Sequence, residues 1–156
     1  MPEEAFASTA DVHAAIECLG RLAELYRERR AQLAASVGLT DQQWGVLEEI
    51  ATEHFMPSLF ARRRESSPAA VSKILRQLAD KGLIVVAIAK GDGRQRKYSL
   101  AAKGKRAMDA LRESREEAIR EVWLKLPARE MRAFTGFGTQ LIRRLEDYAA
   151  DVQPKE

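Results

Sequence analysis

The side chains best suited to binding a partner lie in one basic stretch of the chain, residues 62–106. This stretch holds 13 Lys and Arg against 3 Asp and Glu, a net charge of +10, whereas the rest of the 156-residue chain carries −7. A basic stretch between acidic flanks is typical of a surface that binds phosphate groups. The alternative is an ordinary solvated surface, and the elements that hold the charges decide between the two.

Residues 66–81 have the pattern of an amphipathic helix. Ser67 followed by Pro68 is typical of a helix start, and Gly82 is typical of the residue just after a helix end. Apolar side chains recur at helical spacing, namely Val71, Ile74, Leu75 and Leu78. Residues 83–89 and 96–100 then predict two strands joined by a Gly-rich turn. A polar-faced helix followed by a hairpin with a basic tip is typical of DNA recognition.

This stretch resembles the second half of the winged helix-turn-helix of the MarR family of bacterial transcriptional regulators. The family's helix-end motif GL[IV] matches Gly82-Leu83-Ile84, and its wing motif D-x-R matches Asp92-Gly93-Arg94. The family's L-T-x-x-G motif matches residues 100–104, with Ala101 in place of the usual threonine and its capping hydroxyl. The flanking helices also fit, so that the resemblance covers nearly the whole chain.

The expected fold is mainly α with a small β-hairpin wing, in a single domain over residues 1–156. A winged helix-turn-helix lobe is predicted over 40–101, where Thr40 and Gln43 form a capping box and Pro57 starts a short helix. A long helix is predicted over 102–126, and Pro127 starts the last one.

The helices outside that lobe, over 10–35 and 102–149, carry more apolar surface than one subunit can bury. In the first helix the stripe consists of Val12, Ile16, Leu19, Leu22, Leu25 and Tyr26. In the last helix it includes Met131, Phe134, Phe137, Leu141, Leu145 and Tyr148. An intermolecular core is the better explanation of such stripes, and these helices build a dimer in the family that the chain resembles. A homodimer is therefore expected.

Double-stranded DNA with a palindromic operator is the expected partner. The predicted contacts are Arg62, Arg63, Ser66, Ser67, Ala69, Ala70, Ser72, Lys73, Arg76, Arg94 and Arg96. Small residues in the first turns of the 68–81 helix let it enter a major groove, and Lys73 lies near base edges. Arg76 is better placed for a phosphate, and Arg94 at the hairpin tip is the candidate for the minor groove.

The resemblance also implies a small-molecule effector, because regulators of this family commonly release DNA when an aromatic compound binds between the dimer helices and the DNA-binding lobe. The candidate lining residues are Tyr26, Arg30, Trp44, Phe55, Met56, Met108 and Leu111. They offer aromatic and thioether surface with an arginine able to hold a carboxylate. An aromatic acid or its acyl thioester that relieves a repressor is the hypothesis, and ordinary core packing is the alternative for each residue.

Cys18 allows a redox-sensing alternative, since some members of the family sense peroxides through one cysteine in the first helix. Against this, Cys18 lies in a wide apolar stripe, and no tyrosine is nearer than Tyr26 to partner a sulfenate. A buried structural cysteine is the favoured interpretation.

Other classes of protein fit the sequence poorly. It has no Gly-rich phosphate loop, no paired nucleophile and base and no carboxylate cluster, so that no enzyme or cofactor is expected. Neither His13 nor His54 has a second histidine or a cysteine at i+3 or i+4, which argues against a metal site. No membrane span or signal peptide is expected, and a single cysteine suits a reducing cytoplasm. Two non-enzymatic classes stay open beside the regulator: a sequence-indifferent architectural DNA-binding protein and a helical protein–protein adaptor.

Overall fold

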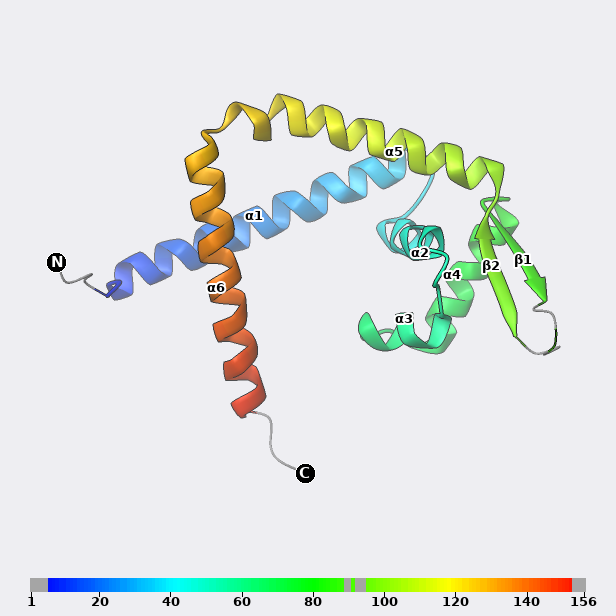
Figure 1. Ribbon diagram of the computed structural model, residues 1–156, viewed down its shortest axis with the longest axis horizontal. Helices are drawn as coiled ribbons and strands as arrows, with labels where there is room; N and C mark the ends of the chain where they lie inside the picture. Colours follow the sequence, from blue (N-terminus) through cyan, green and yellow to red (C-terminus); the bar gives the residue numbers. More distant parts are fainter. Residues whose placement is uncertain (1–5, 89–90, 92–94, 153–156) are drawn as a thin grey trace. The chain divides into compact units, whose positions relative to one another are not determined.

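The computed structural model describes residues 6–88, 91 and 95–152, and these form a mainly helical chain with one small hairpin, as expected (Figure 1). The elements are α1 (Thr9–Ser36), α2 (Asp41–Ala51), α3 (Pro57–Arg63), α4 (Pro68–Asp80), β1 (Ile84–Ile88), β2 (Arg96–Leu100), α5 (Ala102–Glu121), the 3₁₀ turn η1 (Trp123–Lys125) and α6 (Ala128–Val152). The chain divides into two compact units, Met1–Glu113 and Ser114–Glu156. The hairpin and α1 to α4 lie in the first unit.

Side-chain caps set the starts of three helices. Ser8 and Asp11 form a capping box at α1, and Thr40 forms the predicted one with Gln43 at α2. Hydrogen bonds from the Ser8 hydroxyl and backbone N–H hold the pKa of the Asp11 carboxyl below its ordinary value. At α4 the Ser67 hydroxyl accepts a hydrogen bond from the backbone N–H of Ala70 at 3.1 Å. The helices α2 and α4 therefore begin where the sequence predicts.

The end of α4 is a Schellman motif that leads directly into the hairpin. Gly82 has φ +70°, and its N–H donates to the Ala79 carbonyl at 2.9 Å. The Leu83 N–H donates to the Leu78 carbonyl at 3.0 Å, and both leucine side chains are buried. The strands β1 and β2 then pair antiparallel, with Ile84 opposite Leu100 and Ile88 opposite Arg96.

One hydrophobic core holds the elements of the first unit together. Its buried residues are Leu33, Ala34, Leu39, Trp44, Val46, Leu47, Ile50, Phe60, Ala61, Val71, Leu75, Leu78, Leu83, Ile84 and Leu111. They come from α1 to α5, the turns and β1, so that α4 and the hairpin are both attached to the same core. The apolar face predicted for the 66–81 helix is the face that packs inward.

The start of α5 lies close against the end of α4. The backbone N–H of Ala101 donates to the Leu83 carbonyl at 3.0 Å, and the Lys103 ammonium donates to the Lys81 carbonyl at 2.9 Å. Gly104 is buried there, and a Cβ added to it would lie 2.1 Å from the Leu83 carbonyl oxygen. Although Ala101 has no capping hydroxyl, these contacts start the helix at Ala102.

The predicted helix over 102–126 is wrong at its C-terminal end. The α-helix ends at Glu121, and a 3₁₀ turn covers Trp123–Lys125. Leu126 is extended, with φ −89° and ψ 148°, because the ring of Pro127 disfavours helical backbone in the residue before it. Pro127 precedes α6, and its carbonyl accepts the N–H groups of Glu130 and Met131.

Two helices expose the apolar stripes that the sequence predicts to be intermolecular. In α1 only Leu33 and Ala34 are buried, while Val12, Ile16, Leu19, Leu22, Leu25 and Tyr26 are exposed. In α6 no described residue is buried. Phe134, Phe137, Leu145 and Tyr148 of the predicted stripe are exposed, and Met131 and Leu141 are half-buried. Most of each stripe is therefore open to solvent in the single chain.

Candidate nucleic-acid interface

Helix α4 turns one face to the core and the other to solvent. Val71, Leu75 and Leu78 are buried, which leaves the polar side exposed. The predicted DNA contacts on this exposed side are Ser67, Ala69, Ala70, Ser72, Lys73 and Arg76. The first turn thus combines small side chains with an adjacent lysine, a surface that fits against the edges of bases.

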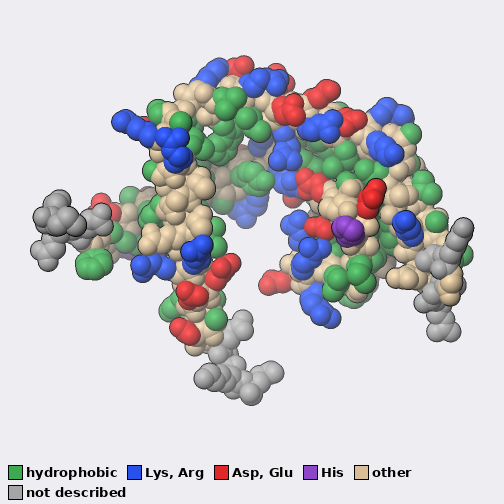
Figure 2. Space-filling model, in the orientation of Figure 1, with side chains coloured by type: hydrophobic (Ala, Val, Ile, Leu, Met, Phe, Trp, Pro, Cys, Tyr) green, Lys and Arg blue, Asp and Glu red, His purple; other side chains and the backbone are tan. Residues whose placement is uncertain are grey.

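The arginines at the end of α3 have different surroundings. Arg62 is exposed and forms no ion pair with any other described residue, whereas Arg63 is paired with Glu49 at 2.9 Å. Arg64 lies over the ring of Phe60, 5.7 Å from its centroid. On the face shown in Figure 2, Lys and Arg side chains gather beside α3 at the edge of the first unit. Arg62 is therefore better placed than Arg63 to contact a phosphate.

Ser66 is half-buried in the turn between α3 and α4, where its backbone N–H donates to the Ala61 carbonyl at 2.9 Å. This backbone hydrogen bond closes the turn, and Ser66 is less exposed than Ser67, which follows it. Arg94, the predicted minor-groove residue, and Asp92 lie outside the described residues. Arg96 is exposed on β2.

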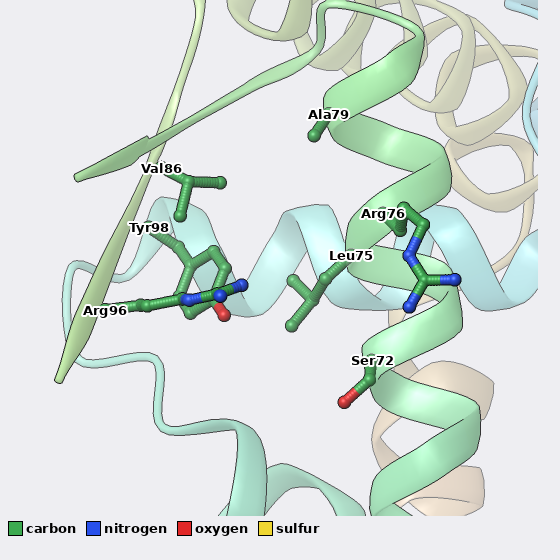
Figure 3. Close-up of a pocket in the computed structure, with 7 residues that line it drawn as sticks. All are labelled: Ser72, Leu75, Arg76, Ala79, Val86, Arg96 and Tyr98. Atoms are coloured by element: carbon green, nitrogen blue, oxygen red, sulfur yellow. The ribbon is translucent and has the colours of Figure 1, made fainter. Parts of the chain in front are cut away.

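A cavity of about 360 Å³ opens between α4 and the hairpin (Figure 3). It is lined by Ser72, Leu75, Arg76, Ala79, Val86, Arg96 and Tyr98. Three of these, Ser72, Arg76 and Arg96, are predicted DNA contacts, and the fold brings them to one site. Within the described part of the chain, neither arginine forms an ion pair.

Tyr98 and Val86 also line this cavity, although neither is among the contacts predicted from the sequence. They are cross-strand partners, and Tyr98 is two residues from Arg96, so that both β2 side chains lie on one face of the strand. The Tyr98 ring packs edge-on against Phe55, with centroids 5.7 Å apart. The alternation in Arg96-Lys97-Tyr98 is the signal that pairs Tyr98 with Arg96.

The candidate effector residues do not share one environment. Trp44 and Leu111 are buried in the core, and Phe55 and Met108 pack partly buried against it. Tyr26 and Met56 are exposed. Core packing, the alternative interpretation, is therefore the observed role of the buried members.

Arg30 is already bound to two carboxylates. Its guanidinium pairs with Asp41 and, at 2.9 Å, with Glu48, and it lies 3.9 Å from the centroid of the Trp44 ring. Burial acts to lower the pKa of Arg30, but the hydrogen bond and charge of Glu48, together with Asp41, raise it above its ordinary value. A carboxylate ligand at Arg30 would have to displace one of these partners. The guanidinium is thus a clamp between α1 and α2 in this structure.

Cys18 is exposed, so the expectation of a buried cysteine is wrong for the single chain. The physical reason is that only Leu33 and Ala34, near the C-terminal end of α1, are buried among the described residues of this helix, whereas Cys18 lies in its exposed N-terminal half. Because Cys18 is exposed in the single chain, its burial cannot be used as an argument against the redox-sensing alternative.

The described residues offer neither a metal site nor a membrane span. Among them, no group of three or more His, Cys, Asp or Glu is placed to hold a metal ion. Within the same part of the chain, no helix has the length and apolar character needed to span a bilayer.

Comparisons with known proteins found one matching family model and several solved structures of similar fold. Residues 37–95 match the model of the MarR family. A search of curated proteins finds no significant match. A crystal structure of a MarR family transcription regulator has a TM-score of 0.82 at 18% identity, covering 92% of this chain and 96% of that one.

Two Staphylococcus aureus structures are also similar. A MepR–DNA complex has a TM-score of 0.64 at 17% identity, covering 82% of this chain and 94% of that one. MarR in complex with salicylate and kanamycin has a TM-score of 0.73 at 18% identity, covering 87% and 93%. At these identities the structural likeness establishes a shared fold.

Proposed function

We propose that this chain, whose residues 37–95 belong to the MarR family, is a transcriptional regulator that binds double-stranded DNA as a homodimer and represses transcription. The observation that carries the proposal is the exposed polar face of α4 together with Arg76 and Arg96, neither of which forms an ion pair with another described residue. In this arrangement the first turns of α4 enter a major groove, and the arginines bind backbone phosphates. The DNA-bound MepR of similar fold supports this assignment.

A homodimer explains why α1 and α6 expose apolar stripes. Pairing of two copies would bury these side chains and would place two α4 helices on two half-sites of an inverted repeat, about one helical turn apart. The palindromic operator expected from the sequence follows from this twofold symmetry.

The first prediction is that the protein binds an inverted repeat in the DNA beside its own gene. Because phosphate contacts release counterions, we expect the affinity to fall about 10³- to 10⁵-fold between 50 and 200 mM salt, as for about 6–10 contacts. Fluorescence anisotropy with a labelled duplex measures both the affinity and the salt slope. A scrambled duplex of the same composition should bind at least about 10³-fold more weakly.

Two outcomes of that experiment would contradict the proposal. Equal affinity for both duplexes would indicate an architectural DNA-binding protein. No binding to either duplex at 50 mM salt would favour a helical adaptor.

The effector proposed for this regulator is an aromatic acid or its acyl thioester. The similar fold of a MarR protein bound to salicylate supports this class of ligand. In this chain the ion pairs of Arg30 indicate how such a ligand would act. A ligand carboxylate that displaces Asp41 or Glu48 from Arg30 would loosen the junction of α1 and α2. If this junction sets the spacing of the two DNA-binding lobes, a ligand that favours another spacing must weaken DNA binding.

The proposed effector class can be tested by titrating benzoate- and cinnamate-type acids and their thioesters against a preformed operator complex. We expect a 5- to 150-fold loss of operator affinity, roughly the usual range of allosteric coupling. In a Trp123→Phe background, the fluorescence of Trp44 should change with the same ligand dependence, since Arg30 lies over that ring. If neither affinity nor fluorescence changes up to millimolar ligand, the aromatic effector is wrong.

A further inference from the structure

The cavity between α4 and the hairpin combines a cationic rim with an apolar floor. Arg76 comes from α4, and Arg96 and Tyr98 extend from β2 toward that helix, while Leu75 points back at them (Figure 3). The side chains of Leu75 and Val86 supply aliphatic surface, and hydroxyl groups come from Ser72 and Tyr98. A ligand that fills this cavity must therefore present both an anion and hydrocarbon.

The described residues that line the cavity leave its positive charge without a neighbouring negative charge. Its lining contains two guanidinium groups and no carboxylate. Elsewhere in the described chain, Arg30 pairs with Asp41 and Glu48, and Arg63 pairs with Glu49. The two cavity arginines differ from these because neither forms an ion pair with another residue that the structure describes, so that both are available to an external anion.

The size and rigidity of the cavity narrow the choice of anion. At about 360 Å³ it is larger than one phosphate group needs, and a phosphate alone would leave the aliphatic floor uncovered. The Tyr98 ring is held by Phe55, which itself packs edge-on against Phe60 with centroids 5.8 Å apart. One wall of the cavity is therefore preformed by aromatic packing.

We propose that this cavity binds one deoxyribose-phosphate unit of the DNA backbone. The phosphate oxygens accept hydrogen bonds from Arg76, Arg96 and the two hydroxyls, and the C–H face of the sugar packs against Leu75 and Val86. This inference rests on the proposed function and deepens it. One shared phosphate would tie α4 and the hairpin to the same point of the backbone and so fix the angle at which the helix enters the groove.

Salt slopes of DNA binding distinguish one shared phosphate from two separate ones. Each substitution is present twice in the dimer. Because the remaining arginine still neutralises a shared phosphate, Arg76→Gln and Arg96→Gln should each lower the slope of log K against log salt by much less than about 1.8. The double variant should lose about 1.8, the contribution of one phosphate in each subunit, whereas separate phosphates would give a loss of about 1.8 for each single variant and about 3.6 for the double variant. Arg120→Gln removes one charge from the exposed surface of α5 and should leave the slope unchanged.

Two further measurements test the neutral parts of the site. Tyr98→Phe keeps the ring and removes only the hydroxyl, so DNA affinity should fall about tenfold with no change of slope. Circular dichroism must show that all variants fold as the parent does. The methyl NMR signals of Leu75 and Val86 should shift when a duplex is added.

The outcomes separate this inference from the proposed function. If the parent binds DNA with a steep salt slope but the double variant loses nothing or about 3.6, or the methyl signals do not move, the shared site is wrong while the DNA-binding function stands. If the parent does not bind DNA, both are wrong.

Discussion

Leu145→Asp is expected to convert the protein from a dimer into a monomer and to lower its operator affinity more than about a hundredfold. Leu145 is 55% exposed in the single chain and lies in the apolar stripe of α6. In a twofold dimer the substitution buries two unpaired carboxylates, each at a cost of several kcal/mol. A monomer can contact only one half-site of the operator, and the loss of operator affinity should therefore be large.

Sedimentation at micromolar concentration measures the change of mass, and anisotropy with the operator duplex measures the affinity. Thr139→Asp is the matched control, because it adds the same charge on the polar side of α6, where the Thr139 hydroxyl donates to the Thr135 carbonyl. The control should stay dimeric. A monomeric parent, or a Leu145→Asp protein that remains a dimer, would refute the dimer.

Gly104→Ala should lower the free energy of unfolding by about 3 kcal/mol or more, the upper end of the range for overpacked sites. The added Cβ would lie 2.1 Å from the Leu83 carbonyl oxygen and 3.1 Å from its carbon. Both are backbone atoms, and the same oxygen accepts the Ala101 N–H, so that they cannot move without breaking the link between the hairpin and α5.

Urea unfolding followed by circular dichroism, at one protein concentration, gives the free energies. Gly45→Ala is the matched control, since Gly45 lies inside α2 and a Cβ there would meet nothing within 4 Å. That substitution should raise stability by up to about 1 kcal/mol, because alanine has the higher helix propensity. Equal effects of the two substitutions would show that the contact with Leu83 does not matter.

Features that depend on neighbours in the chain could be predicted from the sequence. The capping box of Thr40 and Gln43, the Ser67 cap and the Schellman end at Gly82 are all observed. Each involves residues within about five positions of one another, so local backbone geometry determines them. The buried face of α4 was predictable for the same reason, since its helical period is a local property. The sequence also predicted the amphipathic stripes of α1 and α6, but it did not identify the surface that covers them.

Features that depend on contacts between distant segments required the tertiary structure. In the sequence, Arg30 is a candidate for binding the carboxylate of a ligand. In the structure its guanidinium forms ion pairs with Asp41 and Glu48, because the end of α1 packs beside α2. Cys18 was expected to be buried because its neighbours are apolar, but an apolar stripe buries a side chain only where another element covers it.

The cavity of the candidate interface is the clearest case of this kind. Arg76 and Arg96 are 20 positions apart in the sequence, and each alone is an ordinary surface arginine. The core residues Leu78, Leu83 and Ile84 attach both α4 and β1 to one centre, and the register of the hairpin then directs Tyr98 and Arg96 toward the helix. Sequence patterns report which face of each element is polar, whereas packing around a shared core decides which polar faces meet.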